Sequence, residues 1–320
     1  MKIISTRSNL STSSSDAILK GLTYDGGLFV FEQTRPVIFD MSLLNLSYQE
    51  LAVKITSFLF DDYNKDELVH LVNQAYKSKN FIPSIVGIES FKDCAYLELY
   101  NGPTFSFKDL ALSILPLFVK EAKQSKKLIN KTIVLTATSG DTGSAALSGF
   151  SQDEDTVVIV LYPKAGITEF QELQMNSYQS EKLKIFGIDG NFDDCQTIVK
   201  RILNEVIPIN VSLSSANSIN IGRLVPQIVY YFHSYLELVR QEKISERDFI
   251  NVCVPTGNFG NIYAAFLAKQ FGVPIDKLII ASNKNNVLTE LFTTGVYDLR
   301  REFSVTHSPS MDILISSNVE

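Results

Sequence analysis

The second half of the chain alternates short β-branched runs with segments of helical period, and this alternation constrains the fold most. Apolar strands separated by helices predict an α/β fold in which parallel strands are covered on both faces. Ligands of such folds bind beyond the carboxyl ends of the strands, so we expect the functional residues in the loops there. The predicted strands are residues 132–137, 156–161, 183–188, 249–254 and 277–281, and the predicted helices are 142–150, 192–203, 219–239 and 261–271.

A single lysine lies among aromatic and small side chains in residues 94–109. The apolar run from Cys94 to Tyr100 predicts a buried strand, and Asn-Gly-Pro at 101–103 predicts the turn that ends it. Lys108 follows, just before a long helical pattern from Leu110 to Phe118. Burial disfavours a charged amine, so we expect a lowered pKa for Lys108 and the neutral form that Schiff-base chemistry requires. The alternative is a lysine whose stem covers apolar surface while its ammonium group reaches water.

The loop after the strand at 132–137 reads Thr-Ser-Gly-Asp-Thr-Gly and leads into a predicted helix. The free N–H groups and the dipole of a helix N-terminus attract an anion. The alternative is an ordinary N-cap formed by Ser139 or Asp141. The glycine spacing fits neither the dinucleotide-binding fingerprint nor a Walker loop, so a nucleotide site is not indicated.

Two further loops have features suited to anion binding. Gly-Asn-Phe-Gly-Asn at 257–261 could hold a phosphate with backbone N–H groups, although an ordinary strand-to-helix turn explains it equally well. Asn220 and Arg223 are three residues apart at a helix start and share a face. A guanidinium group there suits a carboxylate or a phosphate, and the alternative is a surface arginine near a capped helix.

The composition argues against several classes of partner. Lys and Arg total 29 against 35 Asp and Glu in 320 residues, and this net charge of −6 disfavours nucleic acid or an anionic membrane as the main partner. No apolar run approaches the roughly 18 residues that cross a bilayer, and the first residues do not resemble a signal peptide. The three histidines lack ligand spacing, so we expect no metal site. We predict that Cys94, Cys195 and Cys253 are reduced core residues of a cytoplasmic protein.

The segment before residue 90 has a different pattern. Apolar spacing over residues 51–76 predicts helices interrupted at Asp61-Asp62, and residues 24–30 read as a turn followed by a strand-like run. We therefore predict a small, mainly helical N-terminal domain over residues 1–90. Residues 91–320 would form the catalytic region.

Several of these stretches together resemble the threonine synthases, which are pyridoxal-phosphate enzymes of the tryptophan-synthase β-subunit fold, also called fold type II. The resemblance begins with Asp-Gly-Gly-Leu at 25–28 and runs to the last residue. It includes Asn-Gly-Pro-Thr-x-x-Phe-Lys-Asp, Ser-Gly-Asp-Thr-Gly, Ala-Asn-Ser-Ile-Asn-x-x-Arg, Gly-Asn-Phe-Gly-Asn and Ser-Pro-Ser-Met-Asp-Ile, in the order of that family. It implies a three-layer fold built on parallel sheets.

The resemblance also implies roles for individual residues. Lys108 would carry pyridoxal 5'-phosphate and act as the catalytic base. The implied reaction converts O-phospho-L-homoserine and water to L-threonine and phosphate, by γ-elimination and then β-addition, as the last step of threonine biosynthesis. The implied cofactor-binding residues, besides Lys108, are Gly257, Asn258, Phe259, Gly260 and Asn261, and the implied substrate-binding residues are Ser139, Gly140, Asp141, Thr142, Asn217, Asn220 and Arg223.

The sequence departs from the family at its end. Threonine synthases continue beyond the equivalent of Glu320 with a loop whose hydroxyl group faces the pyridine nitrogen of the cofactor, so we expect these residues to be the N-terminal part of an enzyme. Two alternatives stay open. One is another fold type II enzyme, such as a serine/threonine dehydratase or a cysteine-synthase-like protein. The other is a non-catalytic, threonine-synthase-like protein that binds phosphate without a lysine adduct.

Overall fold

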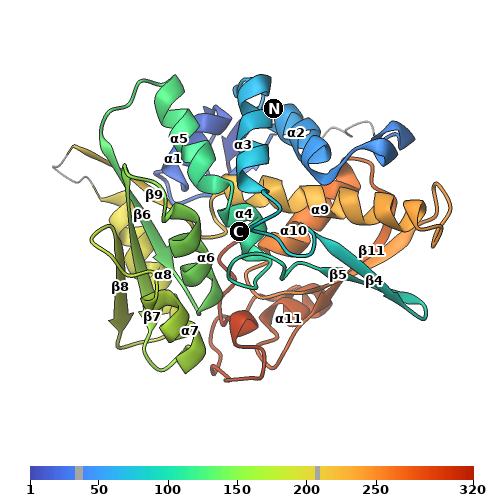
Figure 1. The fold of residues 1–320 in the computed structure, drawn as a ribbon. Helices are drawn as coiled ribbons and strands as arrows, with labels where there is room; N and C mark the ends of the chain where they lie inside the picture. Colours follow the sequence, from blue (N-terminus) through green and yellow to red (C-terminus); the bar gives the residue numbers. More distant parts are fainter. Residues whose placement is uncertain (33–38, 206–209) are drawn as a thin grey trace.

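The structure is a computed structural model that describes residues 1–32, 39–205 and 210–320. Figure 1 shows a parallel sheet on the left, the long helix α9 (Ile221–Arg240) across the middle, and a separate pair of parallel strands to the right. The α/β class with parallel sheets is therefore confirmed.

The largest described sheet has the strand order β8-β7-β6-β9, with all strands parallel. Its strands are β6 (Lys131–Ala137), β7 (Thr156–Pro163), β8 (Leu183–Ile188) and β9 (Val211–Ser215). The first three confirm the strands predicted from continuous apolar runs. β9 was not predicted, because its serines leave no continuous apolar run for a pattern to detect.

Helices cover this sheet on both faces, as predicted. On one face Val134 of β6 shares the main core with Phe150 of α6 (Asp141–Phe150). On the other face Leu135 packs with Cys195 of α8 (Phe192–Asn204) in a second core. Adjacent strand residues point to opposite faces, so the two cores lie on either side of the sheet.

The remaining parallel strands are more exposed than predicted. β10 (Ile250–Pro255) and β11 (Ile275–Ala281) pair in parallel and are joined by α10 (Gly260–Gln270). Ile279 is 44% exposed. The prediction of helices on both faces therefore holds for the four-stranded sheet but is wrong for this pair within the described residues, which place no second layer over its outer side chains.

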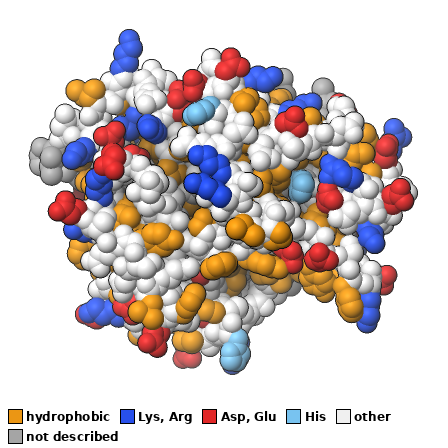
Figure 2. All heavy atoms as spheres, in the orientation of Figure 1, with side chains coloured by type: hydrophobic (Ala, Val, Ile, Leu, Met, Phe, Trp, Pro, Cys, Tyr) orange, Lys and Arg blue, Asp and Glu red, His pale blue; other side chains and the backbone are white. Residues whose placement is uncertain are grey.

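The prediction of a buried strand from Cys94 to Tyr100 is also wrong. The strand β5 (Cys94–Glu98) exists, but among the described strands it pairs only with β4 (Gly87–Phe91), in an antiparallel hairpin. Tyr96 and Tyr100 are more than half exposed, because two strands alone provide one sheet layer and the described residues add no second one. Figure 2 shows hydrophobic side chains gathered across the middle and lower part of this side of the molecule.

The helix predicted from Leu110 to Phe118 is two helices, and Lys108 belongs to the first of them. Lys108 begins α4 (Lys108–Leu112), and a separate helix α5 (Leu115–Ser125) follows. Pro116 explains the break, because proline has no N–H to donate and its ring clashes with the carbonyl group four residues earlier, that of Leu112. The short α4 can therefore take its own direction at the ends of the strands.

The N-terminal segment contains the predicted helices and an additional sheet. The interruption at Asp61-Asp62 is confirmed, and the Asp62 carboxylate accepts the backbone N–H groups of Ser14 and Ser15 at the start of α1. The main core includes both Leu51 of this segment and Tyr230 of α9, so the described packing continues across the predicted domain boundary. The elements of this segment are β1 (Ile3–Ser5), β2 (Ser11–Thr12), α1 (Ser14–Lys20), β3 (Phe29–Phe31), a 3₁₀ helix (Met41–Asn45), α2 (Tyr48–Leu59) and α3 (Lys65–Ala75). Its three strands form an antiparallel sheet in the order β2-β1-β3.

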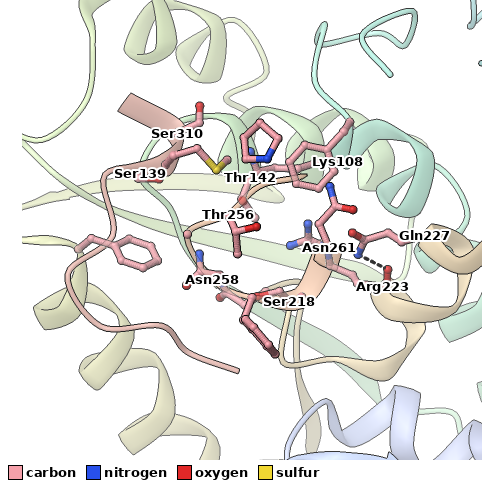
Figure 3. Close-up of a pocket in the computed structure, with 18 residues that line it drawn as sticks. Lys108, Ser139, Thr142, Ser218, Arg223, Gln227, Thr256, Asn258, Asn261 and Ser310 are labelled. Carbon is pink, nitrogen blue, oxygen red and sulfur yellow. Dashed lines mark hydrogen bonds between the residues drawn. The ribbon is translucent and has the colours of Figure 1, made fainter. Parts of the chain in front are cut away.

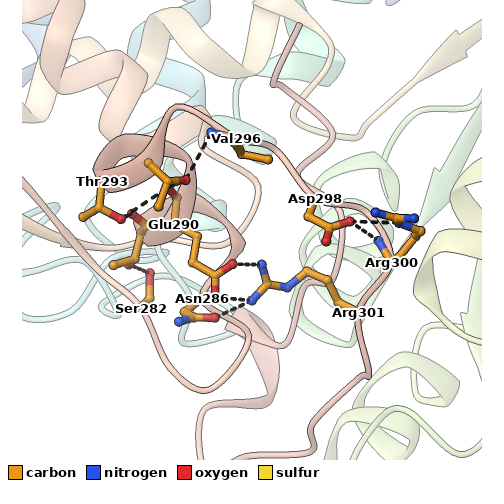
Figure 4. Close-up of polar contacts among 10 residues, drawn as sticks. Ser282, Asn286, Glu290, Thr293, Val296, Asp298, Arg300 and Arg301 are labelled. Carbon is orange, nitrogen blue, oxygen red and sulfur yellow. Dashed lines mark hydrogen bonds and ion pairs between the residues drawn. The ribbon is translucent and has the colours of Figure 1, made fainter.

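The last part of the chain has little regular structure but is held by polar contacts. Arg301 donates two hydrogen bonds to the Glu290 carboxylate of α11 (Val287–Thr294), at 2.6 and 2.9 Å, and one to Asn286 (Figure 4). The buried Asp312 carboxylate follows the 3₁₀ helix Pro309–Met311 and accepts hydrogen bonds from Asn285 and from other polar groups near it. These contacts fix the segment that carries Ser310.

Three predictions about composition can be compared with the structure. The cysteines are free thiols, but only Cys195 is buried, so the prediction of core positions is wrong for Cys94 and Cys253. No helix in the described ranges is long and apolar enough to cross a membrane. The described residues also hold no cluster of three or more His, Cys, Asp or Glu side chains suited to a metal ion.

Candidate active site

One cavity lies where the loops after β6, β9 and β10 meet α4, at the carboxyl ends of the strands as predicted. Figure 3 shows side chains from these loops pointing toward a common centre. The free space is about 40 Å³, so the walls lie close together. The lining includes Lys108, Ser139, Thr142, Asn217, Ser218, Arg223, Gln227, Thr256, Gly257, Asn258, Phe259, Gly260, Asn261, Ser310 and Met311.

Lys108 is buried in the wall of this cavity. Its amine lies 3.1 Å from Oδ2 of Asp141 and 4.7 Å from the centroid of the Phe107 ring. Burial lowers the pKa of the Lys108 amine, and the charge and hydrogen bond of Asp141 oppose this effect. The predicted burial and direction of the pKa shift are confirmed, and the alternative of an ammonium group in water is wrong.

Asp109 shapes the loop that precedes α4. Its carboxylate accepts hydrogen bonds from the backbone N–H of Thr104 at 2.8 Å, from the Thr104 hydroxyl at 2.6 Å, and from the N–H of Ser106 at 3.4 Å. Burial raises the pKa of Asp109, and these hydrogen bonds oppose the rise. The turn before Lys108 is thus closed by the residue that follows it.

The predicted substrate-binding residues of the loop after β6 differ in their position: some line the cavity, and Gly140 forms the start of α6. Ser139 and Thr142 line the cavity. Gly140 is the N-cap of α6 with φ +127°. The Thr138 hydroxyl accepts the N–H of Gly143 in the first turn at 2.9 Å, so the alternative of a cap by Ser139 or Asp141 is wrong. A Cβ atom on Gly140 would lie 2.2 Å from the side chain of Gln171, which only glycine permits.

Asp141 faces Lys108 and two further donors. Gln171, on α7 (Glu169–Asn176), donates from Nε2 to Oδ1 of Asp141 at 2.8 Å, and the Ser310 hydroxyl donates to Oδ2. Burial alone would raise the pKa of Asp141, but the charge of Lys108 and these hydrogen bonds lower it to about 2. The carboxylate is therefore a fixed negative charge beside the Lys108 amine.

The glycine-rich loop leads from β10 into α10. Phe259 is the N-cap of α10 with φ +71°, and no side chain caps the helix, so its first N–H groups remain available to an anion. Oδ1 of Asn261 accepts the hydroxyl groups of the buried Tyr230 and Tyr231. In the described part of the chain its Nδ2 makes no hydrogen bond, so the amide can donate to a ligand in the cavity.

Arg223 supplies a second group of donors to the cavity. It is 3% exposed, and its Nη1 donates to the carbonyl oxygen of Ala216 at 3.0 Å. Its buried Nε has no partner among the described residues. Burial lowers the pKa of Arg223 to about 10, which leaves the guanidinium charged at neutral pH. A buried guanidinium with an unused N–H suits an anionic ligand.

The two predicted asparagines are placed differently. Asn217 lines the cavity, but its amide bonds both the N–H and the carbonyl group of Ala137, at 2.9 and 2.6 Å. Asn220 is fully buried and donates to the carbonyl oxygens of Ile18 and Ser215. The structure therefore does not bring Asn220 to the cavity, and the amides of both residues fix the loop after β9.

The structure places here several residues to which no role was assigned from the sequence. Gln171 belongs to a Thr168-x-x-Gln pattern typical of a capping box, which indicates a helix start but not what the amide contacts next. Ser310 lies in a stretch that resembles the threonine synthases, yet only the fold places its hydroxyl at Asp141. Tyr230 and Tyr231 look like core residues of a helix, because the pattern cannot show where their hydroxyl groups point.

Comparison with known proteins agrees with this geometry. A sequence model described as "Pyridoxal-phosphate dependent enzyme" matches residues 94–316, and one described as "Threonine synthase N terminus" matches residues 2–76. The fold and the site thus define the class of pyridoxal-phosphate-dependent enzymes of fold type II.

Individual relatives narrow the class. The chain is 41% identical to a Homo sapiens protein named threonine synthase-like 1, across 96% of this chain and 43% of that protein, and 36% identical to the threonine synthase of Saccharomyces cerevisiae, across 99% and 64%. Solved structures include a pyridoxal-phosphate-bound threonine synthase from Brucella melitensis (TM-score 0.85, 35% identity, 99% of this chain and 68% of that one). Another is the threonine synthase of Escherichia coli (TM-score 0.88, 30% identity, 99% and 72%). The chain belongs to the threonine synthase family, and it spans less than two thirds of these two curated relatives.

The residues of the cavity fit pyridoxal phosphate. A buried amine with a lowered pKa, an uncapped helix N-terminus and an unpartnered arginine N–H are groups that an aldehyde and a phosphate require. Small-molecule sites usually enclose about 300–1,000 Å³, so the 40 Å³ here must widen.

Proposed function

We propose that this chain carries out the chemistry of a threonine synthase, the conversion of O-phospho-L-homoserine and water to L-threonine and phosphate. One observation carries the proposal: the Lys108 amine is buried beside Asp141 in a cavity that is also bounded by the uncapped N-terminus of α10. This cavity thus combines a nucleophilic amine with a site for a phosphate group.

Cofactor binding is assigned to two elements. Lys108 would hold pyridoxal phosphate covalently, and residues 257–261 would bind its phosphate through backbone N–H groups and Nδ2 of Asn261. The cofactor, when bound, supplies an electron sink that stabilises negative charge beside the substrate α-carbon. The Lys108 Nζ atom would be the base that moves the substrate's α- and β-protons.

Substrate binding is assigned to the opposite wall. Ser139 and Thr142 line the cavity near the start of α6, whose N-terminus favours the substrate carboxylate. Arg223 would bind the phosphate of the substrate through its unused Nε–H and stabilise the departing dianion. Asn217 and Asn220 would act through the loop that they hold.

The test begins with the covalent adduct. The purified chain is mixed with pyridoxal phosphate, reduced with borohydride and mapped by peptide mass, and we expect the adduct on Lys108 and none in Lys108→Ala. Unreduced protein is then given O-phospho-L-homoserine, and we expect threonine and inorganic phosphate in equal amounts.

The other outcomes separate the alternatives. Pyruvate formed from serine without threonine formation would replace the proposal by a dehydratase. Phosphate binding without an adduct on Lys108 and without turnover would favour the threonine-synthase-like protein that is not catalytic. An adduct on Lys108 without turnover of either substrate would contradict the proposed reaction. An adduct confined to other lysines would contradict the assignment of the site.

A further inference from the structure

We infer that Gln171 is a positioning residue, which holds the Asp141 carboxylate against the Lys108 amine and so sets the charge and place of that amine. The inference rests on the proposed function for its meaning, because it concerns the lysine that would carry the cofactor. Its geometry stands independently on the contacts of α7 and α6.

The orientation of the Gln171 amide is fixed by the start of α7. Its Oε1 accepts the backbone N–H of Thr168 at 3.0 Å and the Thr168 hydroxyl at 3.2 Å, which completes a capping box. The acceptor end is thereby occupied, and the donor end must point away from the helix start. It points to Oδ1 of Asp141 at 2.8 Å.

The packing around Gln171 leaves its side chain little freedom. Gln171 is 6% exposed, and its amide lies so close to Gly140 that any Cβ at position 140 would overlap it. Gly140 immediately precedes Asp141. The amide therefore contacts both the backbone before Asp141 and the carboxylate itself, which fixes the first turn of α6.

Both oxygens of Asp141 are thus assigned. Oδ1 accepts from Gln171, and Oδ2 accepts from Lys108 and Ser310. The position at the start of α6 also favours a negative charge. Without the Gln171 donor, Oδ1 would be a poorly satisfied polar atom in a mostly buried place, and the carboxylate would turn away or take up a proton.

Three charged groups act on the Lys108 amine. Asp141 on α6 and Asp109 on α4 favour the protonated amine, and Arg223 on α9 disfavours it. Asp141 is the carboxylate within hydrogen-bonding distance, at 3.1 Å. Weakening the hold on Asp141 should therefore lower the pKa of the amine further and release it from the wall of the cavity.

The experiment measures the charge of Lys108 in protein without cofactor. Formaldehyde and cyanoborohydride methylate neutral amines, and peptide mass spectrometry gives the rate at Lys108 across a pH series. The midpoint of that profile reports the pKa, whereas a change in access alters the rate but not the midpoint. For Gln171→Met we expect a midpoint at least half a unit lower, which corresponds to about threefold faster labelling below the midpoint.

Two further variants serve as the positive and the negative control. Asp141→Asn removes the charge itself and should lower the midpoint by at least as much as Gln171→Met. Thr168→Ala weakens the same helix cap but leaves the amide on Asp141, so its midpoint should equal that of the unmodified protein. If Gln171→Met leaves the midpoint unchanged or raises it while Asp141→Asn lowers it, Gln171 only caps α7 and the inference is wrong.

The outcome is distinguishable from that of the proposed function. A midpoint shift in Gln171→Met without a pyridoxal-phosphate adduct on Lys108 would support the positioning role and contradict the cofactor role. An adduct on Lys108 without a midpoint shift in Gln171→Met would support the cofactor role of Lys108 and contradict the positioning role of Gln171. Circular dichroism of each variant shows whether it is folded, and a Gln171→Met variant that unfolds is replaced by Gln171→Leu, which also lacks the donor to Asp141.

Discussion

The carbonyl oxygen of Leu112 points at the α-carbon of Gly149, so that a Cβ atom at position 149 would lie only 2.1 Å from it. Leu112 ends α4, the helix that begins with Lys108, and Gly149 lies in α6, the helix that begins with Asp141. The close approach of these two helices therefore sets how the ion pair at their other ends is spaced.

Substituting Gly149 by alanine should push the two helices apart. A Cβ at 2.1 Å from a backbone oxygen cannot be accommodated by side-chain movement, so we expect a loss of about 2–4 kcal/mol in the free energy of unfolding. Chemical denaturation measures this loss. Ser148→Ala, a half-buried neighbour in the same helix, should change stability by less than about 0.5 kcal/mol. Equal stability of both variants would show that the helices do not meet closely.

Asp109→Asn should loosen the loop before Lys108. The amide oxygen can replace only one of the two carboxylate oxygens, so the backbone N–H and the hydroxyl of Thr104 cannot both keep an acceptor at residue 109, and we expect a loss of about 1–3 kcal/mol in the free energy of unfolding. Denaturant titration at neutral pH measures the loss. Asp93→Asn, at an exposed turn between β4 and β5, is the matched control and should be neutral. A neutral Asp109→Asn would contradict the structural role assigned to this carboxylate.

Asn261→Asp should weaken binding of phosphate-bearing ligands. The two tyrosine hydroxyls can still donate to the new carboxylate, so the packing is kept, but the free N–H₂ is replaced by a negative charge. We expect pyridoxal phosphate to bind about 10- to 100-fold more weakly, and pyridoxal, which lacks the phosphate, to bind as before. Titrations followed by absorbance measure both ligands. Asn73→Asp on the exposed side of α3 is the control. Equal weakening of the two ligands would place the phosphate elsewhere.

His233 should make the fold less stable in mild acid. His233 lies on α9 and packs against Tyr48 of α2, and burial lowers the pKa of His233 to about 4. Between pH 6.5 and 4 the unfolded chain binds a proton that the folded chain does not, so stability falls as the pH falls. The contribution is on the order of 2–3 kcal/mol over that range.

The measurement compares variants across that pH range. The free energy of unfolding of His233→Gln should fall less steeply between pH 6.5 and 4 than that of the unmodified protein. His70→Gln, at an exposed position, should keep the original slope. Parallel curves for all three proteins would show that His233 takes up its proton equally in both states.

The fold was predictable where one physical effect dominates. Helices cover both faces of the strands β6, β7 and β8, so consecutive residues of these strands are buried and apolar, and the sequence pattern reveals them. The same argument failed for β5, whose run from Cys94 is as apolar but lies in a two-stranded hairpin. An apolar pattern shows which side chains of a strand could be buried. Whether another layer covers them depends on the tertiary structure, which the pattern of one strand does not contain.

The candidate site was predictable from its loops but not from its contacts. Lys108, Ser139 and the 257–261 loop were found because strand ends, glycines and a lone lysine are local signals. The use of Asn220 as a structural clamp was missed, because its partners Ile18 and Ser215 are distant in sequence or belong to backbone. Gln171 was missed for the same reason.

The main core has a consequence for how the molecule comes apart. Because Leu51 of the N-terminal segment and Tyr230 of α9 lie in one continuous core, neither part can open without exposing apolar surface of the other. Unfolding should therefore be a single cooperative event, and amide hydrogens in α2 and in the middle of α9 should exchange with solvent at a common, slow rate. The helices that come before Lys108 in the sequence therefore help to stabilise the region that holds this lysine.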